Sequence, residues 1–214
     1  RRVINNIERS AALFLVKNIF SFVLALISLA FTLPYPLEPA QLTLVSTLSI
    51  GIPSFVLAME PNNSLVKGRF LRNVIYRALP GGFTDLILVI GVMLFYVAFD
   101  FPKEEMSTIS ALLIGVVGLL VLHRFCMPYN KIRTMLMVGM TGSFIVLAVF
   151  FKQLFSLTEL SFSSFLVLAV FALLAYPLMK TLTWFFERLD KKFSPSEGVG
   201  KRQKGKHAAP SKKR

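Results

Sequence analysis

The sequence has few residues that commonly carry catalysis or bind a resident metal. It contains one cysteine, Cys126, and two histidines, His123 and His207. A single cysteine cannot form an internal disulfide, and neither histidine has a partner at metal-ligand spacing. There is also no GxGxxG motif, no phosphate-binding loop and no nucleophile elbow. The sequence therefore predicts no catalytic residue and no metal cofactor in this chain.

Charged residues are scarce as well. Asp, Glu, Lys and Arg make up 16% of the 214 residues, whereas 55% are hydrophobic. The mean hydropathy of +0.66 excludes a water-soluble domain of this length. A spanning helix needs about 20 mostly apolar residues, and such runs lie at 10–33, 40–59, 82–99, 107–122, 134–151 and 162–178. The sequence predicts an all-α integral membrane protein, with a six-helix transmembrane domain at 1–193 and an amphipathic extension of the last helix to Phe193.

Basic residues lie mainly on one side of the predicted spans. They cluster before the first span, between the second and third, between the fourth and fifth, and after Lys180, whereas the opposite loops hold Lys103 and Lys152. Because basic residues in short loops favour the cytoplasm, both termini are predicted to be cytoplasmic. The tail at 194–214 is predicted to be disordered and attracted to anionic lipid headgroups. The net charge of +13 thus points to the lipid bilayer, and not to nucleic acid, as the partner.

Polar residues inside the spans are candidates for function, because a polar group in hydrocarbon is costly. The first span contains Lys17, Asn18 and Ser21 at helical spacing. Lys17 could instead extend to the cytoplasmic interface, and Asn18 could serve a hydrogen bond between helices. The sequence leaves these alternatives open.

The second span combines hydroxyl groups with a helix breaker. Ser46 and Ser49 precede Gly51 and Pro53. Proline removes a backbone donor and obstructs the carbonyl one turn earlier, so the helix is expected to unwind here and to expose carbonyl oxygens that suit hard cations. A proline kink that serves packing alone is the other reading.

Two acidic residues and two pairs of glycines complete the set of candidates. Asp85 and Glu60 are predicted to lie near the cytoplasmic ends of their spans, as possible residues of an ion pathway. The glycines of the fourth and fifth spans are expected to permit close helix packing; they are Gly115, Gly118, Gly139 and Gly142.

Residues 1–80 resemble a known family. The opening RRVINNIERS, followed by VKNIFS, is similar to the stalk and fifth membrane helix of bacterial P-type cation-transporting ATPases. The stretch PYPLEPAQLTLVSTLSIGIPSFVLAMEPN resembles their next turn and sixth helix, where a Q-L motif precedes polar residues and G-[IL]-P. The resemblance implies that the chain supplies the last six membrane helices of such a pump, in the bacterial plasma membrane.

The resemblance also implies a site and its partners. Asn18, Ser21, Ser46 and Ser49 fall on cation-ligand positions of the family, whereas Ile50 stands where calcium pumps carry an aspartate. Calcium is the favoured cation, and Lys17 is a possible charge modulator of the site. The sequence has no DKTGT motif, so Mg-ATP and the catalytic domains are expected elsewhere in the same chain or in a separate one. The alternative is a standalone six-span protein with a packing, lipid-binding or partner-binding role.

Overall fold

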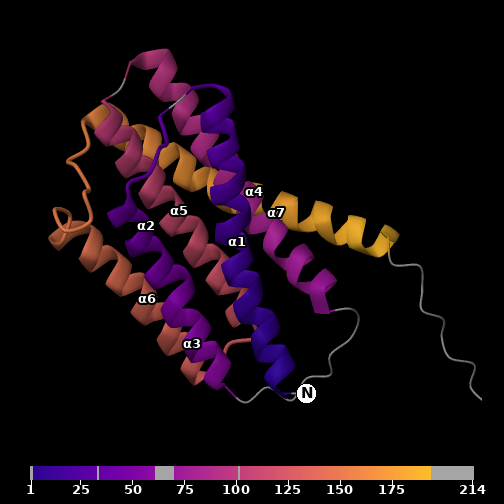
Figure 1. The fold of residues 1–214 in the computed structure, drawn as a ribbon. Coiled ribbons are helices and arrows are strands. Elements are labelled where there is room, and N and C mark those ends of the chain that lie inside the picture. Colours follow the sequence, from indigo (N-terminus) through magenta and orange to yellow (C-terminus); the bar gives the residue numbers. More distant parts are fainter. Residues whose placement is uncertain (1, 33, 61–69, 101, 194–214) are drawn as a thin grey trace, which may run out of the picture.

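The computed structural model describes residues 2–32, 34–60, 70–100 and 102–193, and within these ranges it is helical without any strand (Figure 1). The elements are α1 (Arg2–Ala30), α2 (Pro39–Ser46), the π-helical segment η1 (Thr47–Gly51), α3 (Ile52–Met59), α4 (Phe70–Phe99), α5 (Lys103–Cys126), α6 (Lys131–Phe150) and α7 (Phe162–Phe193). Since α2, η1 and α3 follow one another without a break, they form one span. Within the described ranges, six spans are long and apolar enough to cross a membrane. The predicted all-α fold with six spans is confirmed.

Several helices extend beyond their apolar runs. The helix of the third span begins at Phe70, not at Gly82 as predicted, because Pro80, Gly81 and Gly82 lie inside α4 and do not interrupt it. The last helix continues to Phe193, as expected for the amphipathic extension. Polar residues can continue a helix beyond the hydrocarbon core, so hydropathy alone misses these ends. The predicted tail at 194–214 lies outside the described residues.

The fourth span is the centre of the bundle. α5 contacts α1, α2, η1, α4, α6 and α7, and its buried side chains include Met106, Ile109, Leu113 and Val117. α1 packs along α4 and also contacts η1 and α3. In Figure 1, α1 crosses in front of α5, and the end of α7 projects beyond the other helices, whereas the rest of α7 packs against α4 and α5. The cavity described below lies where α1, the second span, α4 and α5 meet.

Polar contacts show which helix ends share a side of the bundle. Four ion pairs join the start of α1, the end of α3, the starts of α4 and α6, and the ends of α5 and α7; they are Glu8–Arg77, Glu60–Arg133, Arg72–Asp190 and Arg124–Glu187. We call this the basic side. At the opposite side the hydroxyl of Ser107 donates to Gln41, and Thr108 is hydrogen-bonded to Thr158. The spans therefore alternate in direction, as six consecutive crossings require.

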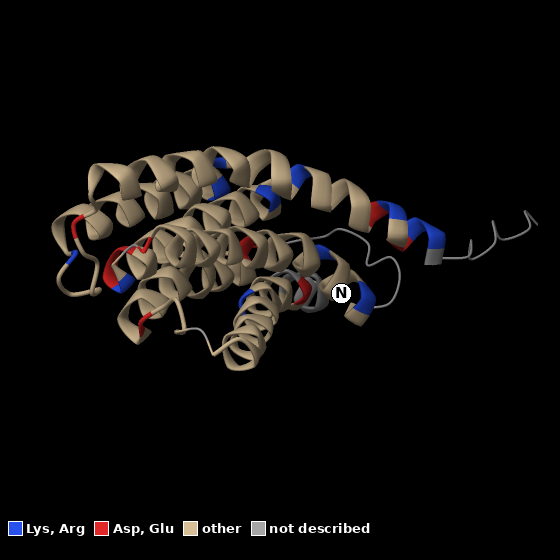
Figure 2. Cartoon of the chain, turned by 90° about the horizontal axis from the view of Figure 1, so that it is seen from above, with Lys and Arg blue, Asp and Glu red and all other residues tan. Residues whose placement is uncertain are grey.

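Apolar side chains cover much of the outside of the bundle. Phe22, Phe55, Met135, Phe150 and Leu173 are among the large hydrophobic residues that are exposed. Figure 2 shows long stretches of helix without charge, and charged residues gathered towards helix ends such as the end of α7. So much exposed apolar surface is unfavourable in water and favourable in lipid. The protein is a multi-pass membrane protein.

Candidate cation site

The second span widens into a π-helical turn at its centre. The N–H of Ile52 donates to the carbonyl of Thr47, five residues earlier, and Pro53 follows at the start of α3. Pro53 has no N–H to donate to the carbonyl of Ser49 one turn earlier. The expected unwinding at Gly51 and Pro53 thus takes the form of a wider turn, while the backbone stays helical. Turns of this kind are frequent at functional sites.

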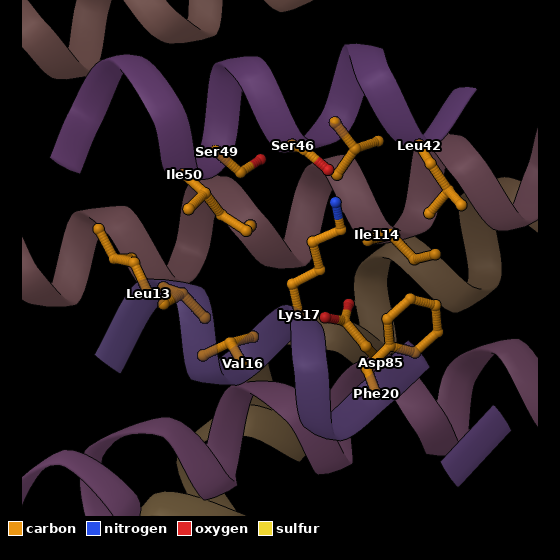
Figure 3. Close-up of a pocket in the computed structure, with 13 residues that line it drawn as sticks. Leu13, Val16, Lys17, Phe20, Leu42, Ser46, Ser49, Ile50, Asp85 and Ile114 are labelled. Carbon is orange, nitrogen blue, oxygen red and sulfur yellow. The ribbon is translucent and has the colours of Figure 1, made fainter. Parts of the chain in front are cut away.

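A cavity of about 30 Å³ lies beside this turn, between α1, the second span, α4 and α5 (Figure 3). That volume has room for one or two water molecules. Most of its lining is apolar, but four polar side chains also line it; they are Lys17, Ser46, Ser49 and Asp85. These four side chains come from three different spans. The other lining residues are apolar and exclude water from the space around them.

Asp85 is the one acidic residue among the described residues that line the cavity. The residue is 3% exposed, and its Oδ1 atom is buried without a hydrogen-bond partner in the described part of the chain. Asp85 lies in the middle of α4, and not at an interfacial end as predicted, because α4 begins earlier than the hydropathy indicates. An ionised carboxylate at this depth is costly unless a cation compensates it.

Two glycines bring α4 close enough to α1 for this arrangement. A Cβ atom on Gly81 would lie 3.3 Å from Val16 side-chain atoms, and one on Gly82 would lie 3.2 Å from Cγ2 of Ile19. Asp85 follows Gly81 by one helical turn and so lies on the same strip of α4. The close approach of the two helices therefore places Asp85 next to Lys17.

Lys17 extends into the cavity. Figure 3 shows its side chain crossing from α1 towards the second span, with the ammonium group near Ser46 and the carboxylate of Asp85 beside its stem. Of the two alternatives that the sequence leaves open, the structure thus has the lysine inside the bundle and not extended to the interface. One positive and one negative side chain share a space of low polarity.

Ser49 packs against α5, the central helix of the bundle. It is buried, and its Oγ atom has no hydrogen-bond partner among the described residues. A Cβ atom on Gly118 of α5 would lie 2.3 Å from Ser49 Oγ and 2.6 Å from Ser49 Cβ. The absence of a side chain at Gly118 is what gives Ser49 its space.

Gly115 similarly accommodates the ring of Phe144, whereas a Cβ atom on Gly139 or Gly142 would have no described neighbour within 4 Å. The expectation of close packing is right for α5 and wrong for α6, because these α6 glycines lie on its exposed side.

The other two predicted ligands do not line the cavity. Asn18 is exposed, since it follows Lys17 on α1 and points about 100° away around the helix. Ser21 lies one turn further along α1 and is absent from the described lining. The structure thus brings together Lys17, Ser46, Ser49 and Asp85 from the predicted set, and leaves Asn18 and Ser21 apart from them.

Glu60, the second acidic candidate, lies in a buried ion pair away from the cavity. Its Oε2 is 2.8 Å from Nε of Arg133, and the side chains are 6% and 9% exposed. Arg133 also donates to the carbonyl of Pro128, at 2.9 Å. This pair connects the end of α3 to the start of α6. Sequence reasoning missed it, since nothing local to Arg133 indicates that its charge is buried.

The chemistry of the cavity suits a hard cation. Carboxylate, hydroxyl and carbonyl oxygens are the ligands that calcium and similar ions prefer. No group of three or more His, Cys, Asp or Glu gathers in the part of the chain that the structure describes. A cage of several carboxylates is therefore not present in these ranges, and Asp85 would be the main charged ligand.

Comparison with known proteins identifies the family of this chain. No family model matches the chain. It is 37% identical over 158 residues to the "Probable cation-transporting ATPase exp7" of Streptococcus pneumoniae, a match that covers 70% of this chain and 20% of that protein. This chain belongs to the P-type cation-transporting ATPases. It is also similar to the "Calcium-transporting ATPase CtpE" of two mycobacteria: 33% identical over 167 residues in Mycobacterium tuberculosis and 36% over 155 residues in Mycolicibacterium smegmatis, covering 69% and 64% of this chain.

The chain spans about a fifth of the length of these ATPases. Its six membrane-length helices are consistent with the carboxy-terminal membrane region of a P-type cation-transporting ATPase. The resemblance stated for residues 1–80 is thereby confirmed at the level of the family.

Proposed function

We propose that this chain is the membrane part of an ATP-driven cation exporter and that calcium is its cation. The observation that carries the proposal is the cavity itself, in which Asp85, Ser46 and Ser49 offer oxygen atoms inside a bundle of membrane helices. Oxygen ligands favour hard cations, and the mycobacterial relatives are named calcium-transporting ATPases. Both facts support calcium over a soft transition metal.

Asn18 and Ser21 would take part when α1 is covered by further helices. Asn18 is exposed on α1, next to the cavity-lining Lys17. The relatives are about five times as long as the matched region, so additional helices of the pump could cover this face and turn Asn18 into an inward-facing ligand. The ion site would then extend from the cavity to the outer side of α1.

The distribution of charge supports the predicted membrane orientation. The basic side carries most described Lys and Arg residues, whereas Lys103 and Lys152 lie at the opposite end. By the positive-inside rule the basic side would face the cytoplasm, together with both chain ends. Mg-ATP hydrolysis in catalytic domains on that side would then tilt the helices that line the cavity and switch cation affinity and access.

The test is cation-stimulated ATP hydrolysis by the pump that contains this chain, reconstituted in liposomes and titrated with calcium, magnesium, manganese, sodium and potassium. We expect stimulation by calcium, with a lower apparent affinity in Ser49→Ala and Asn18→Ala. Ser164→Ala is the matched control for Ser49→Ala, because Ser164 is also buried but lies on α7 away from the cavity. If no cation stimulates the folded pump, a packing or partner-binding role of the six spans replaces this proposal.

A further inference from the structure

We infer that a phospholipid with a zwitterionic headgroup binds in a second cavity of this protein, which lies between α5, α6 and the segment 151–161. One acyl chain fills the cavity, the phosphate contacts the ammonium group of Lys152, and the amine of the headgroup contacts the carboxylate of Glu159. This lipid site lies apart from the candidate cation site and does not depend on which ion is transported.

The cavity forms where α5 and α6 move apart. Its volume is about 270 Å³, roughly twenty times the space that one water molecule needs. The helices are closest where the ring of Phe144 takes the place that a Cβ atom on Gly115 would occupy. From Phe144 the cavity follows α6 to Lys152, towards the end opposite the basic side. The segment after α6, orange in Figure 1, runs along the edge of the bundle and closes one wall.

The inside of the cavity is apolar. Thr108 and Thr158 line it, but their hydroxyl groups are hydrogen-bonded to each other at 3.0 Å, and Thr108 also accepts from the N–H of Thr158. Among the described lining residues, Lys152 carries the remaining polar side chain. A buried water needs two to four polar partners, so this space favours hydrocarbon over water. The apolar lining residues are Leu112, Phe144, Ile145, Ala148, Val149, Leu157 and Leu160.

The cavity is accessible from the lipid. Ile145 and Val149 line it and are 57% and 58% exposed, on a helix of membrane-spanning length. The medium beside them is therefore hydrocarbon, and an acyl chain that enters from it gains van der Waals contacts with the walls. The chain gains little from the hydrophobic effect, because lipid tails are as apolar as the lining. The selection of one lipid over another must come from the headgroup.

Lys152 and Glu159 provide that selection. They form an ion pair at the mouth of the cavity, and their side chains are 40% and 84% exposed. An exposed pair of this kind contributes little to stability and can rearrange. A headgroup with a phosphate and a primary amine, such as phosphatidylethanolamine, offers each side chain an opposite charge. Phosphatidylglycerol has no amine, and its phosphate would be repelled by Glu159.

The experiment locates the lipid in the pump that contains this chain. The purified pump in detergent micelles is incubated with a phosphatidylethanolamine that carries a photoreactive diazirine in its acyl chain, irradiated and digested, and the labelled residues are identified by mass spectrometry. We expect label on Leu112 and on Leu157, which is 6% exposed and faces the cavity. Ala148→Phe fills the cavity and should abolish this label. Val146→Phe is the matched control, since Val146 lies on the same helix outside the lining.

Competition by unlabelled lipids tests the headgroup. Half-displacement of the probe should require about fivefold more phosphatidylglycerol than phosphatidylethanolamine, as expected for one exposed charged contact. In Glu159→Gln this difference should disappear, whereas Lys152→Gln should weaken the binding of both lipids. Glu104→Gln is the control, because Glu104 is an exposed acidic residue at the same side of the bundle and outside the lining.

Three results would overturn the inference. The first is the absence of label on Leu112 and Leu157 in the wild type, as when another helix of the pump fills the cavity. The second is unchanged label in Ala148→Phe, and Ala148→Leu replaces that variant if it does not fold. The third is equal competition by the two lipids in the wild type, or displacement by glycerophosphoethanolamine, which has the headgroup without acyl chains. No cation takes part in this assay, so its result is independent of the ATPase test of the proposed function.

Discussion

Gly118→Ala tests whether the contact between α5 and η1 is as close as the structure has it. The new methyl group would lie 2.6 Å from Cβ of Ser49 and 2.3 Å from its Oγ. Rotation of the serine hydroxyl relieves the second contact but not the first, because the Cβ atom is fixed to the backbone. The helices must therefore separate, and overpacking of this kind costs about 1–3 kcal/mol.

The measurement is unfolding by sodium dodecyl sulfate in mixed micelles, followed by circular dichroism. Gly139→Ala is the matched control: Gly139 is also in a membrane helix, and a Cβ atom there has no described neighbour within 4 Å. The control should be stabilised by up to about 1 kcal/mol, since alanine is a better helix former than glycine. Gly118→Ala should be less stable than the wild type, despite the same gain in propensity.

A compensating variant sharpens the test. Ser49→Gly removes the two atoms that Gly118→Ala would touch, so the double variant should regain stability relative to the sum of the two single changes. Equal stability of Gly118→Ala and Gly139→Ala would refute the reasoning. Additive effects of Gly118→Ala and Ser49→Gly would show that the two residues do not touch.

Three further changes test the contacts that hold the spans together. Arg133→Met should destabilise the protein by about 3–5 kcal/mol, because it leaves the Glu60 carboxylate buried without its charged partner; Glu60→Gln in the same background should recover part of the loss in the same unfolding assay. Gln41→Leu should cost about 1–3 kcal/mol by leaving its buried partners unsatisfied, and a cost near zero would contradict the network. Arg72→Met should cost at most about 1 kcal/mol, because its pair with Asp190 is partly exposed, and high salt should remove the difference from the wild type.

The number of spans, their helical character and the candidate polar residues could be predicted from the sequence. Each depends on neighbours within one segment: about 20 apolar residues favour a spanning helix whatever the rest of the chain does. Helix ends were harder to predict. Pro80, Gly81 and Gly82 look like a break, yet they lie inside α4, where Gly81 and Gly82 let α4 pack closely on α1.

The family follows from sequence as well, since the motifs around VKNIFS and GIPS carry a resemblance that relatives of 33–37% identity confirm. The cation-ligand positions implied by that resemblance agree with the structure only in part. Ser46 and Ser49 line the cavity, whereas Asn18 and Ser21 do not. A linear motif records which residues occur together along one helix, but not how that helix is rotated against its neighbours.

The sequence by itself thus determined that the protein resides in a membrane, that it has six spanning helices, and to which family it belongs, because hydropathy, helical spacing and motifs are properties of short segments. Only the tertiary structure decided that Asp85 and Lys17 share one cavity with Ser49, that Glu60 is paired with Arg133, and that Gly118 has a close neighbour while Gly139 has none. These facts depend on the rotation and separation of helices distant in sequence, which are set by the packing of many side chains at once.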